Sequence, residues 1–95
     1  GTSPSMADTE ATIAELRERI AKTVDYIKSV PASAVDGSEA REVVLKFPNG
    51  EIKFTGVDYL TGFAIPNFMF HVTTAYAILR HSGVPLGKQD FLGGR

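Results

Sequence analysis

The stretch of 21 residues from Tyr59 to Leu79, YLTGFAIPNFMFHVTTAYAIL, contains no aspartate, glutamate, lysine or arginine. A surface helix keeps a polar face, so a helix that is apolar almost all round has to be buried on most sides. The stretch is long enough to span a membrane, but Asn67, His71 and the threonines within it would need polar partners in lipid. We therefore expect no membrane span, and a central bundle helix over about residues 57–82.

Length and charge narrow the classes of function. A chain of 95 residues forms one domain at most, and its formal net charge of −1 gives no electrostatic basis for binding nucleic acid. The absence of cysteine excludes disulfides, thiolate catalysis and cysteine-based zinc sites. The chain does not open with a secretory leader, which makes the cytoplasm the expected compartment.

The pattern near the N-terminus predicts an amphipathic helix over about residues 8–30. Asp8 or Thr9 is available as its cap, and Pro31 ends it. Its apolar residues recur at helical spacing: Ile13, Leu16, Ile20, Val24 and Ile27. Two ion pairs in the favourable order are expected on the opposite face: Glu15 with Arg19, and Glu18 with Lys22.

A β-hairpin is predicted over about residues 42–55. Glu42–Phe47 and Glu51–Thr55 alternate between apolar and polar residues, and Pro48-Asn49-Gly50 supplies the turn between them. The apolar face comprises Val43, Leu45, Phe47, Ile52 and Phe54. A two-stranded hairpin is only marginally stable in water, so we expect this face to lie on a helix.

Pro66 should bend or restart the long second helix, because proline removes a backbone donor and clashes with the preceding turn. Gly83 is placed to end that helix. Residues 84–95 are expected to form an extended tail, and residues 1–5 a loop.

These elements make a mainly α chain that is incomplete. Two helices and a hairpin cannot enclose a helix that is apolar on nearly every side, whereas four helices can. We therefore predict half of an up-and-down four-helix bundle with a two-stranded hairpin insertion, completed by another chain. That chain is either a second copy, which makes a homo-oligomer such as a dimer, or a missing half.

The sequence also resembles a known bacterial family. The string PNFMFHVTTAYAILRHSGVPLGK at residues 66–88, together with ELRERIAKTVDYI at 15–27 and FTG at 54–56, is similar to the C-terminal end of an uncharacterised family. That family lies among the DinB/YfiT-like four-helix bundles. Its members are usually nearly twice as long, with two further N-terminal helices, so the resemblance implies that this chain is the C-terminal half and that a complementary N-terminal half exists.

The resemblance also implies a possible metal site. Many members of the superfamily bind a divalent metal through three histidines, two of them in a His-x-x-x-His motif on the corresponding helix. Here the matching positions hold Asn67 and His71, so only the second agrees, and the third ligand would come from an N-terminal helix. The chain alone is thus expected to hold no cofactor, while the complete bundle has a place for a divalent metal. Superfamily members include thiol-dependent transferases and isomerases.

His71 is the one candidate metal ligand, and it lies four residues after Asn67 on the same side of the helix. Thr74 continues that side, and Tyr59 and Tyr76 are candidates to line a pocket. One interpretation makes His71 a ligand or proton carrier in a metal-dependent enzyme. The other makes it a mostly buried core histidine of a non-catalytic binding or assembly module. No catalytic residue can be named from the sequence.

Overall fold

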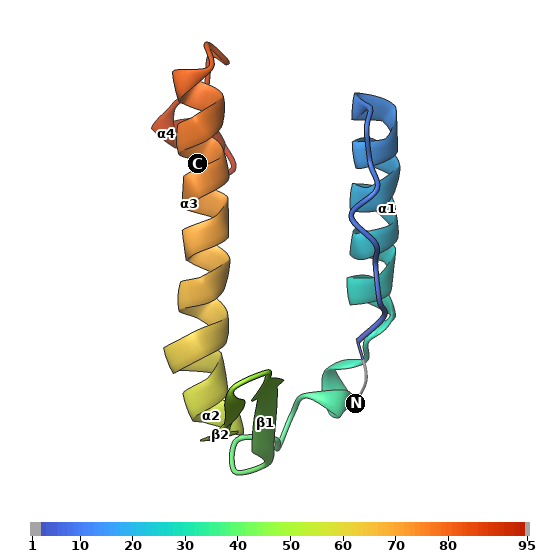
Figure 1. Cartoon of the computed structure of the whole chain (residues 1–95), viewed down its shortest axis with the longest axis vertical. Helices are drawn as coiled ribbons and strands as arrows, with labels where there is room; N and C mark the ends of the chain where they lie inside the picture. Colours follow the sequence, from blue (N-terminus) through green and yellow to red (C-terminus); the bar gives the residue numbers. More distant parts are fainter. Residues whose placement is uncertain (1–2, 95) are drawn as a thin grey trace. The chain divides into compact units, whose positions relative to one another are not determined.

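The computed structural model describes residues 3–94, and the chain divides into two compact units, residues 1–36 and 37–95. The architecture is mainly helical, as predicted, with one antiparallel hairpin (Figure 1). Its elements in chain order are α1 (Ile13–Ser29), η1 (Ala32–Ala34), β1 (Glu42–Phe47), β2 (Gly50–Thr55), α2 (Gly56–Tyr59), η2 (Leu60–Ala64), α3 (Ile65–His81) and α4 (Lys88–Phe91).

The first unit contains α1, which is capped by Thr12. The Thr12 hydroxyl accepts a hydrogen bond from the Glu15 amide at 3.2 Å, and the Glu15 carboxylate accepts bonds from the amides of Ala11 and Thr12 at 2.8 and 2.9 Å. This reciprocal arrangement is a capping box, which satisfies amides that the first turn leaves unpaired. The helix therefore begins at Ile13, and the prediction of a start near residue 8 with Asp8 or Thr9 as cap was wrong.

Residues 3–11, called here the N-terminal arm, form no regular element and run beside α1 (Figure 1). Arg19 holds the arm: its guanidinium donates to the Ala7 carbonyl at 2.8 Å and pairs with Glu10 at 2.7 Å and Asp8 at 3.2 Å. The expected ion pair between Glu15 and Arg19 does not form, because Glu15 is engaged in the cap and Arg19 is engaged by the arm. The predicted Glu18–Lys22 pair is present at 3.4 Å.

In the second unit, β1 and β2 pair in an antiparallel register that matches the predicted apolar face. Val43 lies opposite Phe54, Leu45 opposite Ile52, and Phe47 opposite Gly50. Facing partners project to the same side of a hairpin, so the apolar residues share one face. The second strand begins at Gly50, one residue earlier than predicted, where φ is +141°.

The long helix changes its hydrogen bonding ahead of Pro66. After one turn of α2, the segment η2 is a π-helix, in which the Ile65 amide donates to the Leu60 carbonyl five residues back. Regular α3 then starts with Pro66 in its first turn. A proline ring conflicts with the carbonyl four residues earlier, and a wider turn relieves that conflict. The predicted interruption is therefore a change of helix type, and the chain stays helical through it.

The C-terminal tail is not simply extended, as had been expected for residues 84–95. Lys88–Phe91 form the short helix α4, with the Gly87 amide donating to the Asp90 carboxylate at 2.7 Å. Residues 84–87 form no regular element. Arg95, and the first two residues of the predicted N-terminal loop, lie outside the described residues.

Within residues 3–94 no side chain is buried, whether apolar or polar. The elements of residues 3–94 are thus formed without fully buried apolar side chains, which normally stabilise helices and strands. Of the helices in this part of the chain, none combines the length and apolarity needed to cross a membrane.

Candidate functional site

The most prominent functional feature of α1 is its exposed apolar stripe. All five members lie on one side of the helix and keep 40–69% of their surface in contact with solvent: Ile13, Leu16, Ile20, Val24 and Ile27. Isolated exposed apolar side chains are ordinary, but a contiguous set at helical spacing marks an interaction surface.

The surface of α3 is apolar over a wider arc. Phe68, Met69 and Phe70 are consecutive and therefore point about 100° apart around the helix axis, yet they are 64%, 41% and 64% exposed. Ile65 and Ile78 extend the surface toward the two ends of the helix and are also exposed. One partner helix cannot cover side chains that point in so many directions.

The polar candidates lie on this same helix. Asn67, His71 and Thr74 are all exposed, so the expectation that the His71 ring is mostly buried is not met in the single chain. The nearest aromatic neighbour of the His71 ring is Phe70, edge to face with ring centroids 5.3 Å apart.

Tyr59 belongs to an aromatic cluster at the junction of the hairpin and the long helix. Its ring stacks on Phe63 with centroids 5.7 Å apart, and Phe54 of β2 lies 5.9 Å from both rings. All three side chains are half-buried. This cluster attaches the hairpin to the beginning of the helix through Phe54, and each aromatic pair contributes about 0.5–1.5 kcal/mol beyond the area it covers. Phe47 and Ile52 on the same face are 47% and 48% exposed, so the expectation that the whole face lies on a helix is met only in part.

Tyr76 belongs to a second cluster, near the C-terminal end of α3. The Phe91 ring of α4 packs edge to face on it at 5.5 Å, and the Arg80 guanidinium lies 5.7 Å from its centroid. Arg80 also donates to the Tyr76 hydroxyl at 3.2 Å. Tyr59 and Tyr76 are 17 residues apart on a helical segment, or about 25 Å at 1.5 Å per residue. The structure does not bring these two tyrosines together in one pocket.

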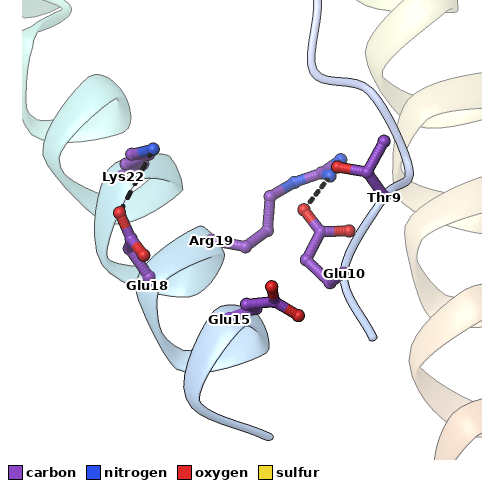
Figure 2. A pocket seen from close by; sticks show the side chains of 6 residues that line it. All are labelled: Thr9, Glu10, Glu15, Glu18, Arg19 and Lys22. Carbon is purple, nitrogen blue, oxygen red and sulfur yellow. Dashed lines mark hydrogen bonds and ion pairs between the residues drawn. The ribbon is translucent and has the colours of Figure 1, made fainter. Parts of the chain in front are cut away.

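A charged hollow lies between the arm and α1 (Figure 2). Figure 2 shows Glu10 of the arm paired with Arg19 of α1 across it, and Glu18 paired with Lys22 along α1. The hydrogen bond from Arg19 lowers the pKa of Glu10 and raises that of Arg19. The Ala11 amide, followed by Thr12, lowers the pKa of Glu15. These groups serve the cap and the arm: Glu10 and Glu18 are paired with cations, and Glu15 accepts hydrogen bonds from two backbone amides.

The side chains that the structure describes do not fit a metal site. Across residues 3–94 no three histidine, cysteine, aspartate or glutamate side chains are grouped closely enough to hold an ion. His71 has an amide, Asn67, at the position one turn earlier, and an amide oxygen is a poor zinc ligand. We assign no chemical step to a metal on this chain.

The sequence-based interpretation missed the role of Arg19 in holding the arm. A signal was available, because Thr12-x-x-Glu15 is a capping-box pattern that places the helix start at Ile13. With Glu15 engaged in the cap, Glu10 and Asp8 on the arm become the carboxylates nearest to Arg19.

Comparison with known proteins identifies the family. A family model described as a domain of unknown function, DUF1993, matches residues 1–92. The chain belongs to the DUF1993 family. This DUF1993 chain is also similar to a DinB family member protein from Shewanella denitrificans whose crystal structure was solved at 1.83 Å resolution, with 40% sequence identity and a TM-score of 0.81. The expected likeness to an uncharacterised DinB-like family is thereby confirmed.

The match covers 98% of this DUF1993 chain but 52% of the Shewanella protein, so the chain spans about half the length of that relative. No curated protein matches the chain.

Proposed function

We propose that this DUF1993 chain is a non-catalytic binding or assembly module whose apolar helix surfaces are covered by helices of another polypeptide. The observation that carries the proposal is the exposure of the α1 stripe and of Phe68, Met69 and Phe70 on α3, combined with the absence of any buried side chain in residues 3–94. Surfaces of this kind stabilise a protein only once they are covered.

The energetics favour assembly over an independent fold. The helices α1 and α3 have 17 residues each, and helices in proteins gain most of their stability from packing of an apolar face rather than from helix propensity. Fully covering one leucine-, isoleucine- or phenylalanine-sized side chain contributes about 1.5–3 kcal/mol. Several such side chains on each helix would supply the stabilisation that this chain lacks alone.

The architecture we propose is half of a DinB-like up-and-down four-helix bundle. The likeness to the Shewanella protein at 40% identity, over only 52% of that chain, supports it, since the remainder of the relative is long enough for further helices. Either a second copy or a complementary N-terminal half would complete the bundle. We place this assembly in the cytoplasm, the compartment expected from the sequence.

The arrangement of His71 supports a binding role over catalysis. Within a bundle, His71, Asn67 and Thr74 would form a polar line inside an apolar surface, where hydrogen bonds across the interface fix the register of the partner. This role needs no set of metal ligands and is consistent with the side-chain amide of Asn67, four residues before His71.

The test is self-association of the full chain, measured by light scattering after size-exclusion chromatography. Phe70→Asp puts a charge on the exposed surface of α3 and should abolish association, because a buried unpaired carboxylate costs several kcal/mol. Lys22→Asp is the matched control: it introduces the same residue on the wet side of α1 and should leave association unchanged. Equal behaviour of the two variants would contradict the proposal.

A second readout addresses the metal directly. Elemental analysis of the assembled protein after incubation with zinc should show no stoichiometric metal that depends on His71. Stoichiometric zinc that is lost in His71→Ala would overturn the non-catalytic interpretation in favour of a metal-dependent enzyme.

A further inference from the structure

The two edges of the α1 stripe differ. On a helix with about 100° per residue, Thr23 and Arg19 lie about 60° and 100° from the stripe centre on one side. The arm covers this edge: the Thr23 hydroxyl donates to the Met6 sulfur at 3.7 Å, and Arg19 binds the Ala7 carbonyl and Glu10. A partner on the stripe therefore has to approach across the other edge.

The open edge is cationic. Arg17 and Lys28 lie about 60° and 80° from the stripe centre on that side, with Ala14 and Ala21 further round the helix. Both charged residues are exposed, and no ion pair of either is formed within residues 3–94. The small alanines allow a second backbone to approach closely along this edge.

The carboxylates of α1 and the arm form no ion pair with Arg17 or Lys28 within residues 3–94. Glu10 is paired with Arg19, Glu15 is held in the cap, and Glu18 is paired with Lys22. Asp25 lies three residues before Lys28, about 60° from it around the helix. Arg17 thus borders the apolar surface with no acidic residue one turn away, and Lys28 borders it without a formed ion pair.

We propose that the α1 stripe binds an amphipathic helix of a different polypeptide, one whose own apolar stripe is bordered by aspartate or glutamate side chains that pair with Arg17 and Lys28. The proposal rests on the proposed assembly function and specifies its partner. Opposite charges along the edges of paired helices select partner and orientation.

Helix geometry disfavours α1 of a second copy as the occupant. In an antiparallel pair related by twofold symmetry like edges meet, so Arg17 and Lys28 of one copy would face the same cations of the other. In a parallel pair they would meet the edge that carries Thr23 and Arg19, which offers no free carboxylate. The other long helix, α3, has no carboxylate at all over Ile65–His81.

The experiment uses the full chain and a charge-reversed form of it, Arg17→Glu/Lys28→Glu, as the acidic-edged probe. Arginine, lysine and glutamate have similar helix propensities, so α1 should be retained, which circular dichroism checks. Wild-type chain carrying a fluorophore on an appended C-terminal cysteine is titrated with unlabelled wild-type chain, with the reversed chain, or with Lys22→Glu as control. The control makes one of the same charge changes on the wet side of α1.

We expect the reversed chain to bind the labelled wild type about threefold to tenfold more tightly than wild type binds itself, as two exposed ion pairs allow. The gain should shrink at high salt, because exposed charges are screened, and Lys22→Glu should give none. Equal affinities, an equal gain for the control, or binding to anionic phospholipid vesicles in place of the reversed chain would overturn the proposal. Association without charge preference would refute this inference alone, whereas failure of every form to associate would also refute completion of the bundle by a second copy.

Discussion

The helices α1 and α3 have the same length, 17 residues, and are stabilised in opposite ways. In α1 the stabilising signals are local: a capping box at Thr12, the Glu18–Lys22 pair, and an arm held by Arg19. Its sequence is also rich in alanine, glutamate, lysine, arginine and leucine, which favour the helix.

By contrast, α3 continues the helical segment of α2 and η2, so its cap lies at Thr55, whose hydroxyl accepts from the Asp58 amide at 3.2 Å, and α3 itself has no ion pair along its length. Its sequence contains adjacent β-branched residues, Val72, Thr73 and Thr74, and several aromatics, which lose side-chain freedom in a helix. Local signals within its own sequence therefore favour α1 more strongly than α3.

Contacts support the α3 region at its beginning and, through Tyr76 and Phe91, near its end, and a pair of glycines tests how much those at the beginning matter. A Cβ added at Gly56 would overlap the Ser38 backbone carbonyl, where the loop is held by the Val57 amide bonding to the Glu39 carbonyl at 3.0 Å. Gly56→Ala should therefore destabilise the second unit by about 2 kcal/mol, the usual scale of overpacking.

Gly62→Ala is the matched control, because a Cβ there meets nothing within 4 Å. It should leave the free energy of unfolding unchanged or raise it by up to about 1 kcal/mol, the difference in helix propensity between the two residues. Denaturant unfolding at fixed protein concentration measures both variants. An equal loss of unfolding free energy in both variants would mean that the contact between the loop and Gly56 does not anchor the long helix.

The local stability of α1 is tested by its cap. Thr12→Ala removes the hydroxyl that accepts from the Glu15 amide and should cost about 1 kcal/mol of helix stability. Thr9→Ala changes the residue that the sequence also offered as a cap, and it should have little effect because the helix does not start there. Amide hydrogen exchange over the first turn of α1 distinguishes the two, and a larger effect at position 9 would refute the assigned cap.

Much of the fold follows from the sequence, but the candidate site follows only in part. The α1 stripe and the facing of Val43 with Phe54 come from hydrophobic periodicity alone, which local geometry determines. The π-helical turn was not predicted, because Pro66 shows that the α pattern must change without showing how. The helix α4 was missed because its glycine-rich surroundings resemble a loop, although Asp90 three residues after Gly87 is a start signal.

The surroundings of His71 could not be predicted for a different reason. Its position on α3 is set by the chain, but the groups that we propose to face it belong to another polypeptide. Neither periodicity nor spacing within this sequence carries information about them.

The smallest expected effect concerns pH at the arm. The pKa values of Glu10 and Glu15 are lowered from 4.5, so their contribution to holding the arm and the cap is complete above that value. It is lost as the pH falls below 4.5 through the lowered pKa values of the folded chain. Carboxyl-carbon NMR should show both groups titrating below 4.5.

Arg19→Gln separates the two carboxylates. It should raise the titration midpoint of Glu10, whose main stabilising partner it removes, and leave that of Glu15, which depends on the Ala11 and Thr12 amides. A shift of both midpoints would mean that the arm and the cap form one unit.

The central claim is that the chain has no compact folded state on its own and acquires its core by assembly. Sedimentation velocity combined with far-UV circular dichroism, over about a hundredfold dilution of the full chain, tests it most directly. We expect helix content to fall on dilution as the associated form dissociates. The dissociated chain should sediment more slowly than a compact particle of the same mass, because it is expanded. A compact monomer that keeps its helix content throughout the dilution would contradict it.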